Sequence, residues 1–322
     1  MLATTLAKGA LGSLRKRGPY DGARLPTDPL VLRDVHVDRA RLATYAAVCG
    51  FAPPGAGAGT GTGTGTGAGT GAVLPATYPH VLGFPLAMRL LADRAFPFPL
   101  LGLVHTGIEV TQHRALRADE GLPEVRVRAE GLAAHRRGSS FDVVTEVRAD
   151  GTEVWRSRST YLYRHARAAG TEAGAETGVE VPGGPLPVRA EWALPGDLGR
   201  RYAAASGDRN PIHLHPLTAR PFGFRRAIAH GMWLAARCLA ATEAGAQAEP
   251  DAGTGAGFTG AGRLTLSAEF RSPVLLPATV HYGERNGTFE LRARPRPDAT
   301  DADGSSRAPR LHLTGRVSSG SP

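Results

Sequence analysis

A dense group of polar residues lies in residues 202–231, which read YAAASGDRNPIHLHPLTARPFGFRRAIAHG. The alanine-rich opening of this stretch is predicted to be a short helix that ends at Gly207. The Asn210–Pro211 step also interrupts a helix, because the residue before a proline avoids the helical region. We therefore expect Asp208 and His213, five residues apart, on an irregular turn. Such a turn can bring a carboxylate and an imidazole to one point, where they can hold a water molecule and move protons near neutral pH.

The end of the stretch is predicted to begin a long apolar helix. A turn at 221–224 comes first, and residues 228–231 then lead into the helix. The first turn of a helix has free backbone N–H groups and the positive end of the helix dipole. A glycine at position 231 lets a ligand oxygen approach that backbone closely. The Gly231 N–H is thus a candidate oxyanion donor for an enolate-like oxygen on a carbonyl or thioester.

Other roles for these residues stay open at this point. Asp208 could simply cap a turn, and His215 and His230 could both be structural. His213 and His215 could form half of a metal site with Asp208 and His230. No further His, Cys or Asp cluster stands nearby, so we expect no metal. Ser206 lacks a Gly-x-Ser-x-Gly context and is not expected to be a nucleophile.

The composition indicates a folded protein that works in a reducing compartment. The chain has 322 residues, 42% of them hydrophobic, which suggests two domains or one large one. Two cysteines, Cys49 and Cys238, cannot form a disulfide framework, so we expect the cytoplasm. No run reaches the ~18–20 apolar residues of a membrane-spanning helix. The first 17 residues lack a charged region before an apolar stretch, so we expect a packing helix there and no secretory signal.

The net charge of +9 points to an anionic partner. Arginine supplies most of it, and the arginines are scattered or in short pairs with no continuous basic tract. Nucleic acid is therefore not expected. An acidic protein or a phosphorylated substrate would give this charge a use.

Low-complexity tracts divide the chain. A Gly/Thr/Ala tract at 55–71 is predicted to be a flexible loop insertion, and two further loop-like segments cover 247–262 and 295–306, the latter a hairpin loop. A Gly/Ala-rich linker at 166–185 separates a block at 30–165 from a block at 186–318. Each block is predicted to contain a short helix, a longer apolar helix and then four strands. The predicted strands cover 107–111, 124–134, 140–148, 154–163, 264–271, 279–284, 288–294 and 310–317.

The two blocks resemble an internal duplication. Residues 45–51 (YAAVCGF) align with 202–208 (YAAASGD), and 82–87 (LGFPLA) align with 230–235 (HGMWLA). In this alignment Phe51 stands opposite Asp208 and Leu82 opposite His230. At these two positions the polar group occurs in the second half only, which is expected if one half performs chemistry and the other shapes a pocket.

The motif resembles that of a known family. Tyr-x-x-x-Ser-Gly-Asp-x-Asn-Pro-Ile-His at 202–213, Phe-Gly-Phe at 222–224 and Ile-x-His-Gly-Met at 228–232 are similar to the signature of the MaoC-like hydratases. In the first half, Leu-Pro-x-Thr-Tyr-Pro at 74–79, His105-Thr106, Arg-Ala-Glu at 128–130 and His-Arg-Arg-Gly at 135–138 resemble actinobacterial double-hotdog 3-hydroxyacyl-thioester dehydratases. So does the strand at 268–277. The chain departs from the pattern at His215, where many relatives carry Asp.

The resemblance implies an α+β double hotdog, in which two antiparallel sheets each wrap around a long helix and pack as a pseudo-dimer joined edge to edge. It implies a hydro-lyase that hydrates trans-2-enoyl thioesters and dehydrates (3R)-3-hydroxyacyl thioesters of coenzyme A or acyl carrier protein. Asp208 and His213 would be the catalytic pair and Gly231 the oxyanion donor. Supporting roles would fall to Asn210, which would orient the pair, and to Ser206 and His230.

The same resemblance implies no cofactor, because the substrate carries its own activating thioester. Arg271 is our candidate for a phosphate contact; a surface arginine at a strand end is the alternative. The acyl tail would lie against the first half's helix, expected at 84–96. A hotdog thioesterase and a thioester-binding subunit without turnover are the alternative functions. Further dimerisation of the chain is left open.

Overall fold

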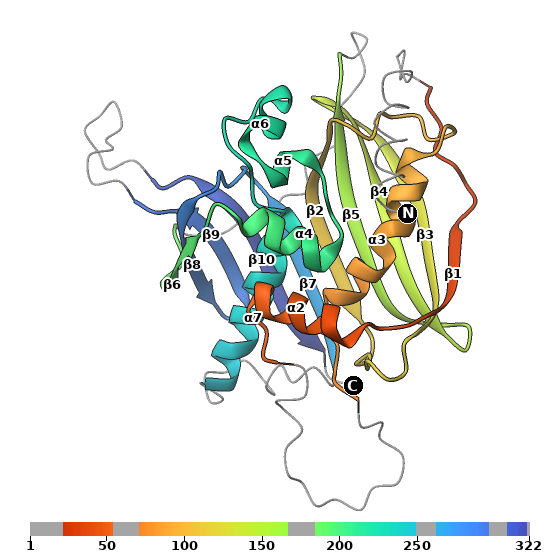
Figure 1. The fold of residues 1–322 in the computed structure, drawn as a ribbon, viewed down its shortest axis with the longest axis horizontal. Helices are drawn as coiled ribbons and strands as arrows, with labels where there is room; N and C mark the ends of the chain where they lie inside the picture. The colour runs from red at the N-terminus through yellow and green to blue at the C-terminus, as the bar shows by residue number, and fades with distance from the viewer. Residues whose placement is uncertain (1–21, 54–70, 167–183, 249–261, 296–307, 321–322) are drawn as a thin grey trace, which may run out of the picture.

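The structure is a computed structural model that describes residues 22–53, 71–166, 184–248, 262–295 and 308–320. Its centre is a ten-stranded antiparallel sheet with the order β1-β3-β4-β5-β2-β7-β10-β9-β8-β6 (Figure 1). The first five strands in this order come from the N-terminal half of the chain and the last five from the C-terminal half. The strands are β1 (Leu30–Val35), β2 (Leu103–Gln112), β3 (Leu122–His135), β4 (Gly138–Ala149), β5 (Thr152–Arg164), β6 (Val188–Leu194), β7 (Arg263–Phe270), β8 (Ala278–Arg285), β9 (Thr288–Ala293) and β10 (Leu311–Gly320).

One long helix packs on each half of the sheet. In the first half α3 (Tyr78–Ala92) lies over β3 and β4, and in the second half α7 (Gly231–Ala248) lies over β7 and β10 (Figure 1). Shorter helices α2 (Arg39–Cys49) and α4 (Leu198–Ser206) pack on each other. Two single-turn helices, α5 (Pro211–Leu214) and α6 (Pro216–Ala219), and the 3-10 turn η1 (Arg220–Phe222) follow α4. This is the double hotdog that the resemblance implied.

Alternation along the strands separates two faces. On β3, Val125 and Val127 are buried toward α3, because successive side chains of a strand point to opposite faces. Arg128, the residue after Val127, points to the other face and pairs with Glu146 of β4 through a 2.5 Å contact between Nη1 and Oε1. The apolar face therefore forms the core under the helices, and the other face carries ion pairs.

The two halves join through the pairing of β2 with β7. Residues 107–112 of β2 run antiparallel to residues 264–269 of β7, which makes the sheet continuous. Above the sheet, Trp233 Nε1 of α7 donates to the Val48 carbonyl of α2 at 2.8 Å. The rings of Tyr45 and Tyr202, on α2 and α4, have centroids 6.1 Å apart. The halves thus share backbone, hydrogen-bond and aromatic contacts.

The helix ends support the duplication in one place and correct it in another. Helices α2 and α4 both end at a glycine in the left-handed conformation, Gly50 with φ 78° and Gly207 with φ 83°. Phe51 and Asp208 therefore follow equivalent helix ends. The pairing of Leu82 with His230 is wrong, because Leu82 lies inside α3 whereas His230 directly precedes α7.

Each of the eight predicted strands is present, and two were missed. β1 and β6 pair only with β3 and β8, at the two edges of the sheet. The first half's long helix begins at Tyr78 and not at residue 84, because Pro79 stands in the first turn, where proline is well tolerated. The predicted segments at 1–17, 55–71, 166–185, 247–262 and 295–306 lie wholly or mostly outside the described residues. None of the helices in the described part of the chain combines the length and apolar character that crossing a bilayer requires.

Candidate active site

The loop after α4 fixes the position of Asp208. Gly207 ends the helix in a left-handed conformation, and the Asp208 N–H then donates to Ser206 Oγ at 3.1 Å. The Asn210 N–H donates to Asp208 Oδ1 at 3.1 Å. One carboxylate oxygen of Asp208 therefore caps the turn, as the structural alternative proposed. The side chain is 25% exposed, and its second oxygen, Oδ2, faces the histidines.

The next turn positions His213 on a helix. Asn210 Oδ1 accepts from the Ile212 N–H at 3.4 Å, and Pro211 occupies the first position of α5. This pair is a strong helix start. The expectation of an irregular turn is correct for Asp208 but wrong for His213. The Asn210 side chain also does not contact the Asp208 carboxylate in the described hydrogen bonds; it caps α5, and its backbone N–H holds Asp208.

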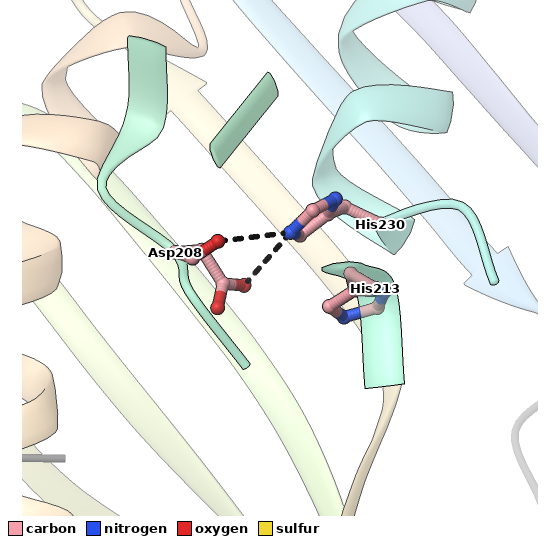
Figure 2. Close-up of side chains that lie close together, drawn as sticks. All are labelled: Asp208, His213 and His230. Carbon is pink, nitrogen blue, oxygen red and sulfur yellow. Dashed lines mark hydrogen bonds and ion pairs between the residues drawn. The ribbon is translucent and has the colours of Figure 1, made fainter. Parts of the chain in front are cut away.

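Asp208, His213 and His230 converge (Figure 2). One ligand atom from each lies within 4.8 Å of the others. The two imidazole rings stack with centroids 3.7 Å apart and an interplanar angle of 25°. His230 Nε2 lies 3.1 Å from the Asp208 backbone carbonyl and 3.9 Å from Oδ2 (Figure 2). The structure thus brings the expected pair together and adds His230 beside it.

The hydrogen bonds define which nitrogen of each ring carries a proton. His213 Nδ1 lies 2.8 Å from the Ile228 carbonyl, so Nδ1–H donates and the neutral ring has its lone pair on Nε2. Burial lowers the pKa of His213, against the opposing effects of the Asp208 charge and the Ile228 carbonyl. Burial and the neighbouring His213 lower the pKa of His230 as well. Both rings are therefore neutral near pH 7, and His213 Nε2 has a lone pair that can accept a proton.

The start of α7 lies next to these side chains. His230 precedes Gly231, the first residue of this 18-residue helix. The N–H of a first helical residue has no acceptor within the helix. A side chain at position 231 would place its Cβ 3.0–3.1 Å from the Phe270 ring, so glycine lets this helix start pack closely on Phe270. Gly231 lies at the helix start as predicted, and its N–H stays a candidate oxyanion donor.

The cluster also has the donor types of a metal site. Among the described residues, Asp208, His213 and His230 form the group whose ligand atoms are close enough to share an ion. His230 Nε2 faces the Asp208 carbonyl, however, so in the neutral ring this nitrogen carries the proton and not the lone pair. His215 lies outside the group: its Nδ1 accepts from the Leu217 N–H at 3.2 Å and caps α6.

One supporting residue was missed in the sequence. The Arg41 guanidinium of α2 donates through Nε to the Ala205 carbonyl and through Nη2 to the Ser206 carbonyl, both at 2.7 Å. These are the last carbonyls of α4, which lack helical partners. Arg41 therefore anchors the helix end that carries Asp208 to the other half of the molecule. Sequence spacing cannot reveal this contact, because 164 positions separate Arg41 from Ala205.

Arg271 directly follows β7, a position that fits both a phosphate contact and a surface arginine at a strand end. Its Nη2 lies 2.6 Å from Glu269 Oε2, and its side chain is 37% exposed. The Arg271 N–H donates to the His312 carbonyl at 2.9 Å. The guanidinium is thus held at the surface by a neighbouring carboxylate.

A separate cavity of about 370 Å³ lies away from this cluster. Trp192, Trp233 and Arg237 line it, and the Arg237 guanidinium lies 4.7 Å above the Trp192 ring. None of Asp208, His213 and His230 contributes to its wall. The candidate active site is identified by converging polar groups and not by cavity volume.

Comparison with known proteins agrees with the geometry. Residues 180–287 match the model of the MaoC like domain. The chain is 35% identical over 273 residues to 3-hydroxyacyl-thioester dehydratase X of Mycobacterium tuberculosis, covering 84% of this chain and 85% of that protein. The crystal structure of HtdX from M. tuberculosis superposes with a TM-score of 0.64 at 32% identity, over 91% of this chain and 100% of that one.

A more distant structure shows the same fold. The MaoC-like dehydratase of Phytophthora capsici aligns with a TM-score of 0.62 at 15% identity, over 92% of this chain and 96% of that one. The level of identity to the mycobacterial dehydratase, sustained over most of both chains, establishes kinship. This protein belongs to the MaoC-like dehydratase family.

Proposed function

We propose that this protein is a hydro-lyase that interconverts trans-2-enoyl and (3R)-3-hydroxyacyl thioesters. The observation that carries the proposal is the convergence of Asp208 and neutral His213 beside the first N–H of α7. The relative named 3-hydroxyacyl-thioester dehydratase supports it. A carboxylate, a base and an oxyanion donor at one point are the groups that adding water across an activated double bond requires.

The fixed tautomer of His213 suggests the order of proton transfers. In hydration, Asp208 Oδ2 accepts one O–H of a water molecule and His213 Nε2 accepts the other. The water oxygen attacks C3 as Nε2 takes that proton, and the electron pair of the double bond moves onto the thioester oxygen. The resulting imidazolium returns the proton to C2 on the same face. Dehydration is the reverse: Nε2 removes the C2 proton and then protonates the departing hydroxyl.

The Gly231 N–H stabilises the negative thioester oxygen in both directions. It lies at the positive end of α7, where backbone dipoles favour an anion. No metal or other cofactor has a step in this scheme, because the thioester itself makes C2 acidic and C3 electrophilic. His230 orients the cluster by donating to the Asp208 carbonyl and stacking on His213.

The remaining assignments extend this proposal to the whole chain. The second half, 186–318, supplies the catalytic groups, and the first half, 30–165, supplies the acyl pocket along α3.

The thioester arm belongs to coenzyme A or an acyl carrier protein; both are anionic and match the net charge of +9. Arg271 is our candidate for a contact with a phosphate of that arm. Two buried free cysteines fit the cytoplasm. A homodimer is compatible with the two sheet edges, and nucleic acid has no role.

Substitution of the catalytic pair tests the mechanism. Asp208→Asn and His213→Ala should each lower crotonyl-CoA hydration by about 10²–10⁴-fold while the melting temperature stays within a few degrees. The ultraviolet absorbance of the enoyl thioester reports turnover directly. His215→Ala is the matched control, because this exposed histidine lies on the same segment outside the cluster. Full activity in either catalytic variant contradicts the mechanism.

The same samples separate the alternatives. A thioesterase would release free thiol from acyl-CoA without loss of the enoyl chromophore by hydration. A binding subunit would bind the thioester and turn over neither reaction. Hydration without thiol release is the expected result.

A further inference from the structure

The half of the molecule that lacks the catalytic pair contributes its own polar groups near Asp208. The charge of Asp208 acts on His80 of α3, His105 of β2 and Tyr161 of β5. Asp208, His105 and Tyr161 are all partly exposed, as is Phe270 at the end of β7. Side chains of the first half therefore lie within electrostatic reach of Asp208.

His105 is held rigidly by its neighbours. Its ring stacks on Tyr161, with centroids 4.8 Å apart and an interplanar angle of 17°, and it contacts the Phe270 ring at 4.9 Å. Phe270 in turn lies against Gly231, where the proposed oxyanion donor is. Two aromatic rings thus fix the plane of the imidazole close to both the acid and the oxyanion position.

A β-bulge sets the direction of the His105 side chain. The register of β2 against β5 shifts between His105, opposite Tyr161, and Gly107, opposite Thr160, so that Thr106 is the extra residue. Bulges re-aim side chains and recur next to active sites. This bulge lies where β2 begins to pair with β7, at the junction of the two halves.

The hydrogen bonding of His105 is incomplete. A backbone hydrogen bond with Gly107 raises the pKa of this imidazole, as expected for a ring N–H that donates to a carbonyl, whereas burial lowers it to about 3. The other nitrogen, Nε2, is buried and has no hydrogen-bond partner. The neutral ring therefore presents an unsatisfied acceptor, and leaving a buried acceptor unpaired is unfavourable. A bound ligand with an O–H or N–H donor would satisfy it.

We propose that His105 is a substrate-binding residue whose Nε2 accepts a hydrogen bond from a donor group of the bound thioester. The inference rests on the proposed function, because that function defines the ligand. The donors on a 3-hydroxyacyl thioester are the 3-hydroxyl of the acyl chain and the hydroxyl and amide N–H groups of the phosphopantetheine arm. The 3-hydroxyl is the favoured donor, because the charge of Asp208 acts on His105 and Phe270 links its ring to Gly231. His105 thereby helps distinguish hydroxylated from saturated acyl chains.

Equilibrium binding tests the proposal without turnover. In an Asp208→Asn background, calorimetry measures the affinity for (3R)-3-hydroxybutyryl-CoA and for butyryl-CoA, which lacks the hydroxyl. His105→Phe keeps an aromatic ring in the stack and removes the acceptor, whereas His105→Gln keeps an acceptor near the position of Nε2. We expect His105→Phe to weaken 3-hydroxybutyryl-CoA by about tenfold and His105→Gln to restore most of this loss. His113→Phe, at a β2 end paired with Glu153, is the control.

The outcomes separate the possibilities. Weakening of 3-hydroxybutyryl-CoA alone identifies the 3-hydroxyl as the donor. Equal weakening of both ligands by His105→Phe, restored by His105→Gln, identifies a donor group of the arm. Unchanged affinities in His105→Phe, or a larger loss in His105→Gln than in His105→Phe, overturn the proposal, since a purely packing role favours the aromatic ring. Failure of the proposed function is seen separately, as wild-type protein that binds these thioesters and does not hydrate crotonyl-CoA.

Discussion

Removing the Arg41 guanidinium should loosen the catalytic loop from a distance. Arg41 donates two hydrogen bonds of 2.7 Å to the last carbonyls of α4, those of Ala205 and Ser206. Hydrogen bonds to a charged group contribute about 1.5–3 kcal/mol each when buried. The Arg41 side chain is partly exposed, so water can replace part of the stabilisation that its two hydrogen bonds provide. We therefore expect Arg41→Met to lower the free energy of unfolding by about 2 kcal/mol in total.

That energy translates into two measurable quantities. In a chain of this size, 2 kcal/mol lowers the melting temperature by roughly 3–4 °C. If all of the loss falls on the docked state of the loop, kcat falls by up to about 30-fold, because 1.36 kcal/mol is a factor of ten. Hydrogen exchange should quicken at the Asp208 and Asn210 amides, which lie in the loop that Arg41 anchors.

The assay needs two companion variants. Arg41→Lys should recover only part of the loss, because one ammonium cannot reproduce the planar fork that binds both carbonyls. Arg39→Met, an exposed position on the same helix, should match wild type. Wild-type stability and kcat in Arg41→Met would show that the contact between α2 and α4 does not hold the loop, and the argument would fail.

Four further outcomes are expected. Gly231→Ala should lower kcat/KM about tenfold, because its Cβ meets the Phe270 ring and the start of α7 or that ring must shift; an unchanged kcat/KM would show that the close packing of Gly231 on Phe270 does not matter for turnover. Burial lowers the pKa of His80 to about 4, below its unfolded value of about 6.5, so the unfolded state binds the extra proton. The contribution of His80 to the free energy of unfolding is then full above about pH 6.5 and falls toward pH 4, by about 2 kcal/mol at pH 5. An equal loss of stability between pH 6.5 and pH 4 in His80→Phe would refute this contribution. Trp233→Phe removes the hydrogen bond to the Val48 carbonyl and should cost about 1 kcal/mol in a denaturant titration. Dialysis against EDTA should leave hydration of crotonyl-CoA unchanged, and activity restored by added zinc would contradict the metal-free mechanism.

The parts of the fold that follow from local chemistry were predictable from the sequence. Gly207 ends a helix through its conformation, and the alternating strands of both halves were found because period-two burial is visible along the chain. Edge strand β1 was missed: four of its six residues are exposed, so its alternation is weak. The helix that carries His213 does not follow from reading Pro211 as an interruption, because a proline after a capping Asn210 starts a helix.

The site was predictable to the same extent. Asp208, His213 and Gly231 lie within one motif, and their convergence follows from a short loop that leads back to a helix start. Arg41 and the geometry of His105 could not be predicted, because both depend on contacts between halves. Such contacts are set by how β2 pairs with β7 and α2 packs on α4, which no local pattern encodes.

The equivalent ends of α2 and α4 have a consequence for stoichiometry. After the glycine, one helix continues into an acid and the other into Phe51, whose ring stacks on Tyr45 with centroids 6.2 Å apart. A symmetric dimer of two identical halves would carry two such acids and two active sites. Here Phe51 occupies the second position, so each chain should bind one equivalent of thioester. Cooperativity between two active sites within one chain is then not expected.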